Sequence, residues 1–253
     1  MITSNIAVNL IGYYGSDETV IQAAQVFVPQ ETERSPEKLM FYLAKGMRIE
    51  AFAEAVNRVI YLSNQGDVSG LVDELHALVN TPTHFAPFAH PQVTLRITAP
   101  LAIARQLWKS HVGAVGGDCG YPIWNELSFR KQRTLEMYAP EGSPATYTAA
   151  LEVTEEAYET LLTEEVHPEL ARFVLPGATM TTWVWTGSLL FFAKLYNLRS
   201  RSDVQSEART VMEAMSPLFA DTFPLAWRAL TSSCINGLGG LNPEGFITLP
   251  VES

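Results

Sequence analysis

The spacing of apolar and polar residues predicts three short strands in the chain. Apolar residues take every second position over 92–98, which is typical of a strand with one buried face. Two more apolar segments, 8–14 and 179–186, have the length of strands, and the second places Trp183 and Trp185 on the same side. These strands account for only a small part of the chain.

Longer segments carry apolar residues at helical spacing. Ser16 and Ser35 are typical N-cap residues, and Pro36 occupies the first helical position after Ser35. The predicted helices begin at Ser16 and Ser35 and cover 48–64, 68–79, 101–108, 147–165, 168–174 and 188–215, the last of them bent near Ser200. The tail over 233–253 is rich in Gly and Pro, carries no period and is expected to be irregular.

Helices interleaved with a few strands predict an α+β or mixed α/β fold. The chain shows no internal repeat and no linker that would divide it, so we expect a single domain over 1–253. Its 253 residues, 47% of them hydrophobic, are sufficient to bury a sizeable core.

The composition narrows the possible functions. The chain has 27 acidic and 17 basic residues and a formal net charge of −10, which argues against binding to polymeric nucleic acid. An anionic small molecule needs only a few local arginines and backbone amides, so a nucleotide ligand stays possible. No apolar run has the roughly 18 residues of a membrane span, and no leader pattern precedes the first strand. With only two cysteines, we expect a cytoplasmic protein.

Several common catalytic motifs are absent from the sequence. It has no phosphate-binding Walker loop, no Gly-x-Ser-x-Gly nucleophile elbow and no His-Glu-x-x-His zinc motif. His84 and His90 lie six residues apart in an irregular stretch, and we expect no metal site there.

Polar side chains concentrate in a helix–loop segment after the central predicted strand. The segment contains Arg105, Gln106, Lys109, His111, Asn125, Glu126, Ser128 and Arg130. A hydroxyl and a guanidinium two residues apart, as in Ser128 and Arg130, can bind a phosphate together with backbone N–H groups. A solvated polar loop would have the same composition, so the segment alone does not decide between these interpretations.

Several motifs in order resemble the flavin-dependent thymidylate synthase (ThyX) family. They are His-x-x-Pro-Phe-x-His at 84–90, an Ala-Pro helix ending in Arg-Gln at 99–106, Asn-Glu-x-Ser-x-Arg at 125–130, Ala-Arg-x-x-Leu-Pro at 171–176, Trp-Thr at 185–186, Leu-Arg at 198–199 and Gln-x-Glu at 205–207. The resemblance extends from about residue 8 to residue 230. It implies a ThyX-like α+β domain, with helices packed around a small, mostly antiparallel sheet.

The family's chemistry is reductive methylation at C5 of a pyrimidine nucleotide such as dUMP. Methylenetetrahydrofolate provides the carbon, FAD the hydride, and NADPH reduces the flavin. The resemblance implies nucleotide contacts from Gln106, Glu126, Leu127, Ser128, Phe129, Arg130, Arg172 and Arg199, with Arg199, Arg172 and Glu126 as catalytic residues. It implies flavin contacts from His84, Lys109, Ser110, His111, Asn125, Leu198 and Arg199. It also implies a homotetramer with active sites shared between subunits.

The chain departs from the family pattern mainly on the flavin side. The changed positions are Phe27, Ala86, Ala89, Lys109, Ser110, His111, Ser188, Leu190 and Asp203. An insertion over 113–123 adds Cys119, either an ordinary loop thiol or a nucleophile for the pyrimidine. The alternatives are therefore a non-catalytic or flavin-free nucleotide-binding relative, and a substrate such as UMP or dCMP with a methyl or hydroxymethyl product.

Overall fold

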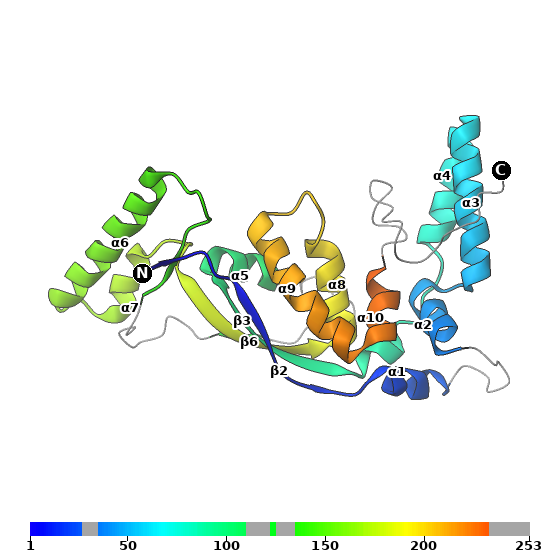
Figure 1. Cartoon of the computed structure of the whole chain (residues 1–253), viewed down its shortest axis with the longest axis horizontal. Coiled ribbons are helices and arrows are strands. Elements are labelled where there is room, and N and C mark those ends of the chain that lie inside the picture. The colour runs from blue at the N-terminus through cyan, green and yellow to red at the C-terminus, as the bar shows by residue number, and fades with distance from the viewer. Residues whose placement is uncertain (27–34, 110–121, 125–134, 233–253) are drawn as a thin grey trace. The chain divides into compact units, whose positions relative to one another are not determined.

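The computed structural model describes residues 1–26, 35–109, 122–124 and 135–232. The chain divides into two compact units (Figure 1). The sheet unit consists of Met1–Tyr14 and Gln92–Leu218, and the helical unit of Gly15–Pro91 and Phe219–Ser253. Each unit therefore draws on two separate stretches of the chain.

A four-stranded sheet forms the centre of the sheet unit. Its strands are β2 (Ala7–Tyr14), β3 (Gln92–Pro100), β6 (Met180–Ser188) and β4 (Pro122–Trp124), in that order, and each neighbouring pair is antiparallel. The three predicted strands and the mostly antiparallel sheet are confirmed, and with them the α+β fold class. The short strand β4 was not predicted.

The two faces of this sheet differ in chemistry. Leu95 and Trp185 are partners across β3 and β6, and both are almost fully buried. On the opposite face the hydroxyls of Thr98 and Thr182 form a hydrogen bond of 2.8 Å between the same strands. This alternation is the period of two that the sequence predicted.

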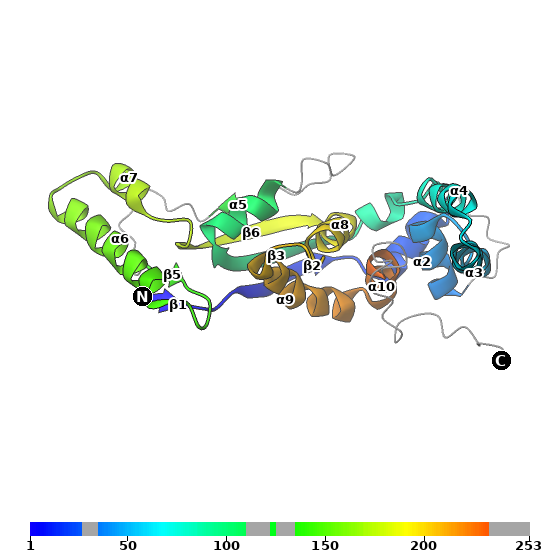
Figure 2. The ribbon, with the colours of Figure 1, turned by 90° about the horizontal axis from the view of Figure 1, so that it is seen from above.

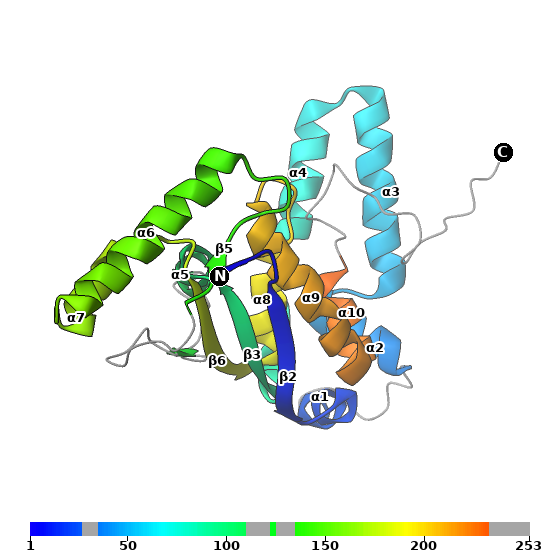
Figure 3. The ribbon, with the colours of Figure 1, turned by 60° about the vertical axis from the view of Figure 1, so that its left-hand side comes forward.

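Helix α8 (Leu189–Arg199) packs on the apolar face of the sheet (Figure 3). The ring of Trp185 meets those of Phe191 and Phe192 at centroid distances of 5.1 and 6.0 Å. Ser188 starts the helix, because its hydroxyl accepts a hydrogen bond of 3.1 Å from the backbone N–H of Phe191. The buried tryptophan is thus a core residue, as its type predicts.

The predicted single helix over 188–215 is wrong. The helix α8 ends at Arg199, and α9 (Ser206–Thr222) begins after a turn. In this turn Arg201 donates two hydrogen bonds, of 3.0 and 3.1 Å, to the carboxylate of Asp203. Ser and Asp side chains compete with the helical backbone for hydrogen bonds, which favours a break over a bend here.

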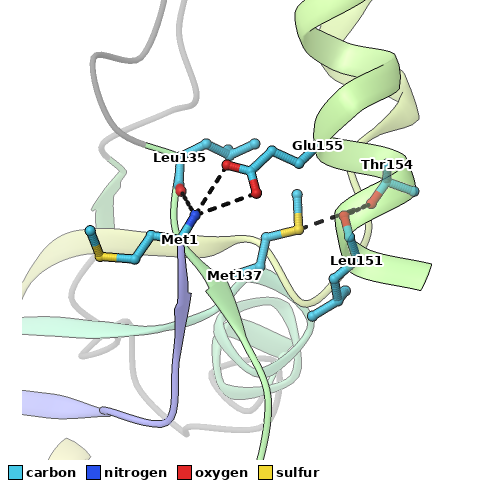
Figure 4. A network of polar contacts seen from close by, with 6 residues as sticks. All are labelled: Met1, Leu135, Met137, Leu151, Thr154 and Glu155. Carbon is cyan, nitrogen blue, oxygen red and sulfur yellow. Dashed lines mark hydrogen bonds and ion pairs between the residues drawn. The ribbon is translucent and has the colours of Figure 1, made fainter. Parts of the chain in front are cut away.

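A smaller core lies where the chain start meets α6 (Ala145–Thr163). Strand β1 (Ile2–Thr3) pairs in parallel with β5 (Met137–Tyr138), and neither strand was predicted. The terminal ammonium of Met1 donates to the carbonyl of Leu135 at 2.9 Å and lies 3.1 Å from a carboxylate oxygen of Glu155 (Figure 4). The helix α7 (Pro168–Ala171) and the 3-10 turn η3 (Arg172–Val174) pack against α6.

Four of the predicted helices lie in the helical unit. They are α1 (Asp17–Ala24), α2 (Pro36–Lys45), α3 (Ile49–Gln65) and α4 (Val68–Val79). The 3-10 turn η1 (Ala86–Ala89) and the helix α10 (Pro224–Thr231) also belong to this unit, and neither was predicted. The helices α3 and α4 lie side by side as a hairpin (Figure 2), and the ion pair of Arg58 with Glu74, at 3.3 Å, joins them. Stacked rings of Phe219 and Trp227, 4.5 Å apart, belong to the core of this unit.

Candidate functional site

Two of the predicted nucleotide contacts meet in the sheet unit. Gln106 lies in the last turn of α5 (Leu101–Trp108), and Arg199 is the last residue of α8. The Nη2 atom of Arg199 donates a hydrogen bond of 3.3 Å to the backbone carbonyl of Gln106. Both residues are half-buried. Their contact joins the C-terminal ends of two helices, although the two residues are 93 positions apart in sequence.

These helix ends carry positive charge. Carbonyl groups at a helix C-terminus attract cations, and Arg199 ends α8 while the exposed Lys109 caps α5. Leu198, beside Arg199, exposes 46% of its surface. Cations beside an exposed apolar side chain can bind a ligand that combines a flat ring with negative charge.

Arg172 begins η3 and is half-buried. The residues around it are unusually apolar for a surface turn, because Leu170 and Phe173 expose 59% and 75% of their area and Val174 exposes 38%. Leu170 lies in α7, and the other two lie in the 3-10 turn η3 that follows it. An exposed apolar cluster beside a cation is typical of a surface that contacts another molecule.

His84 belongs to the helical unit and precedes η1. Its imidazole stacks on the ring of Tyr42, with 5.2 Å between ring centroids and 28° between planes. Its backbone N–H donates to the carbonyl of Leu43 at 2.9 Å. The end of α2 therefore determines where this predicted flavin contact lies.

The other predicted contacts lie outside the described residues. They are Ser110, His111, Asn125, Glu126, Leu127, Ser128, Phe129 and Arg130, together with Cys119 and most of the 113–123 insertion. The phosphate site and the role of the insertion therefore stay predictions. Within the described ranges, no group of three or more His, Cys, Asp or Glu side chains is placed to hold a metal ion.

The structure accounts for some of the departures from the family pattern. Ser188 is fully buried and caps α8, and Leu190 is 7% exposed in the core of the sheet unit. Asp203 is exposed, and its hydrogen bonds from Arg201 lower the pKa of its carboxyl. These three positions therefore have structural roles of their own in this chain.

Two contacts of the predicted site residues were not found from the sequence. The stacking of Tyr42 on His84 and the bond from Arg199 to the carbonyl of Gln106 both join distant parts of the chain. The spacing of apolar residues within a segment does not indicate such pairs, because the two partners lie in different segments and each segment has an ordinary pattern of its own.

The chain is similar in sequence to flavin-dependent thymidylate synthases. A flavin-dependent thymidylate synthase of Thermus thermophilus is 30% identical over 166 residues, which cover 61% of this chain and 62% of that relative. The match thus spans less than two thirds of that relative's length. The enzyme of the same name from Treponema pallidum is 25% identical over 238 residues, which cover 87% of this chain and 67% of the relative.

The fold also matches a solved structure. The crystal structure of the UMP/dUMP methylase PolB from Streptomyces cacaoi, bound with 5-Br dUMP, superposes with a TM-score of 0.65 at 23% identity. The superposition covers 91% of this chain and 96% of that one. None of the helices in the described ranges is both long and apolar enough to cross a membrane. Residues 9–225 match the family model described as Thymidylate synthase complementing protein, Thy1, and the chain belongs to this family.

Proposed function

We propose that the chain catalyses flavin-dependent methylation, or hydroxymethylation, at C5 of a pyrimidine nucleoside monophosphate such as dUMP. The observation that carries this proposal is the contact of Arg199 with Gln106, because it joins two residues of the family's nucleotide-binding motifs. Family membership and the names of the relatives support the same reaction. UMP and dCMP are the alternative substrates.

The two residues have separate roles in this proposal. The guanidinium of Arg199 stabilises the negative charge that develops on the pyrimidine when C5 becomes nucleophilic. Its bond to the carbonyl of Gln106 orients the guanidinium before substrate binds, which reduces the reorganisation needed during the reaction. Arg172 contributes a second cation, and Glu126, Ser128 and Arg130 complete the nucleotide site.

The residues present fit a flavin. FAD, when bound, supplies the hydride, and NADPH and 5,10-methylenetetrahydrofolate serve as cosubstrates. The exposed side chain of Leu198 suits the apolar ring system, while Arg199 and Lys109 suit its negative charge. His84, Ser110, His111 and Asn125 stay the other predicted flavin contacts.

We further propose that the chain acts as a cytoplasmic homotetramer, with 1–253 as a single ThyX-like domain. The exposed cluster of Leu170, Phe173 and Val174 beside Arg172 supports an oligomer, because contact with another subunit would bury apolar surface. In such an assembly Arg172 would serve the active site of a neighbouring subunit.

The test is tritium release from C5-labelled dUMP, UMP and dCMP, each with FAD, NADPH and methylenetetrahydrofolate. The substrate that releases tritium identifies the base and the sugar. Arg199→Gln should lower kcat/KM by about 100-fold or more, as expected when a cation that stabilises transition-state charge is lost. Arg201→Gln is the matched control, because Arg201 is exposed and pairs with Asp203 in the next turn.

Two results would contradict the proposal. One is the absence of tritium release from all three nucleotides. The other is a native protein that neither contains nor takes up FAD, which would favour the flavin-free relative. In that case loss of turnover in Cys119→Ser would identify the thiol as the nucleophile.

A further inference from the structure

The end of α2 holds the segment that leads to His84 at three places. The backbone N–H of His84 donates to the carbonyl of Leu43 at 2.9 Å, and its ring stacks on Tyr42. Gly46, at φ 75°, lets the chain approach so closely that any added Cβ would collide with the carbonyl of Pro82. Three contacts of different kinds therefore determine the position of this short segment.

These contacts are tertiary, because a hairpin separates the two segments in sequence. The chain leaves α2 at Gly46, forms the whole of α3 and α4, and returns at Pro82. The ring of His84 therefore contacts a side chain that is distant in sequence.

The exposure of Tyr42 separates it from its neighbours on α2. Leu39, Met40, Phe41, Leu43 and Ala44 are all buried, whereas Tyr42 is half-buried. Its ring therefore lies at the edge of the core, where it can contact a side chain that must also reach a ligand. His84 is likewise half-buried.

We propose that Tyr42 is a positioning residue that fixes the imidazole plane of His84 for flavin binding. The centroid distance of 5.2 Å lies within the range in which aromatic pairs attract each other. A ring held in one plane before the ligand arrives loses less conformational freedom on binding. This inference rests on the proposed function, since His84 is one of the flavin contacts assigned there.

The first experiment needs no flavin. It records the His84 ring protons by NMR in the cofactor-free protein, with the signal assigned among the five histidines by its loss in His84→Gln. Tyr42→Met should move the signal downfield, because protons over the face of an aromatic ring are shielded by it. Tyr42→Phe should leave the signal in place, since the ring remains. Tyr61→Met is the control, because Tyr61 is 62% exposed on α3 of the same unit.

The second experiment measures FAD affinity in the same variants. Tyr42→Met should weaken binding by about twofold to tenfold, the size expected from one aromatic pair. Tyr42→Phe and Tyr61→Met should both bind FAD like the parent chain. If Tyr42→Met does not fold, Tyr42→Leu replaces it, since leucine also favours helices and lacks a ring.

The outcomes separate the two proposals. An unchanged His84 signal in Tyr42→Met would overturn the positioning role, and so would a moved signal with unchanged FAD affinity. A parent chain that binds no FAD would overturn the assignment of His84 to the flavin and the proposed function with it. The NMR shifts would still show in that case whether the ring of Tyr42 stacks on His84.

Discussion

Replacing Asp17 should destabilise the helical unit, because this residue caps a helix from far away in sequence. Its carboxylate accepts hydrogen bonds from the backbone N–H groups of Leu225 at 2.8 Å and Ala226 at 3.0 Å, in the first turn of α10. Pro224 at the first helical position has no N–H, and the N-cap residue Phe223 has no side-chain acceptor. Asp17 thus satisfies the first two N–H groups of the helix.

The size of the effect follows from these two bonds. Hydrogen bonds to a charged group contribute about 1.5–3 kcal/mol each, and a half-buried carboxylate belongs near the lower end. Asp17→Ala should therefore lower the free energy of unfolding by about 2–3 kcal/mol. Asp17→Asn keeps an acceptor oxygen but loses the charge at the helix N-terminus, so its effect should be about half as large.

The assay is urea unfolding followed by circular dichroism. Glu18→Ala is the matched control, because Glu18 is exposed in the same first turn of α1 and its carboxylate accepts a hydrogen bond from Gln22 of the same helix. Its loss should cost about 0.3–1 kcal/mol through the helix dipole and the exposed hydrogen bond from Gln22. If Asp17→Ala and Glu18→Ala have equal free energies of unfolding, the capping argument is wrong.

Two other substitutions test local features of the fold. Gly46→Ala should lower the stability in thermal unfolding more than Gly66→Ala does, because both glycines have positive φ but an added Cβ has room only at Gly66 and would meet Pro82 at Gly46. Equal losses of stability, each near about 1 kcal/mol, would show that the backbone conformation alone matters. Burial, with a smaller effect of Glu159, raises the pKa of the Tyr158 phenol above its usual value of 10.0. The stability that the neutral phenol contributes to the folded chain is therefore complete below the unfolded pKa and is lost as the pH rises through the folded pKa. As the pH rises above about 10, Tyr158→Phe should therefore lose less free energy of unfolding in urea titrations than the parent chain does. An equal pH dependence in the two chains would contradict this.

Local signals in the sequence located most helices and strands correctly. The serine and proline at 35–36 do cap and begin α2, since the hydroxyl of Ser35 accepts from the backbone N–H of Lys38. The alternation over 92–98 does give one buried face to β3. Such signals succeed because a cap or a hydrophobic period acts within one or two turns of the chain.

Most of the errors occurred where distant contacts decide the structure. The helix α10 begins with an N-terminus that its own residues do not cap, and Asp17, 208 residues earlier, supplies the missing acceptor. Strands β1 and β5 contain two residues each, too few to show a period, and they form by pairing with distant parts of the chain. The break after Arg199 depends on polar turn residues that also occur within helices.

The sequence by itself determined the α+β class, the order of the main elements and the membership in a family of nucleotide enzymes, because these follow from local periodicity and from motifs in register. Only the tertiary structure decided that the guanidinium of Arg199 meets the carbonyl of Gln106 and that the ring of Tyr42 stacks on His84. A hydrogen bond or a ring contact between distant residues depends on how whole helices pack, and packing combines many weak contacts that no short segment encodes.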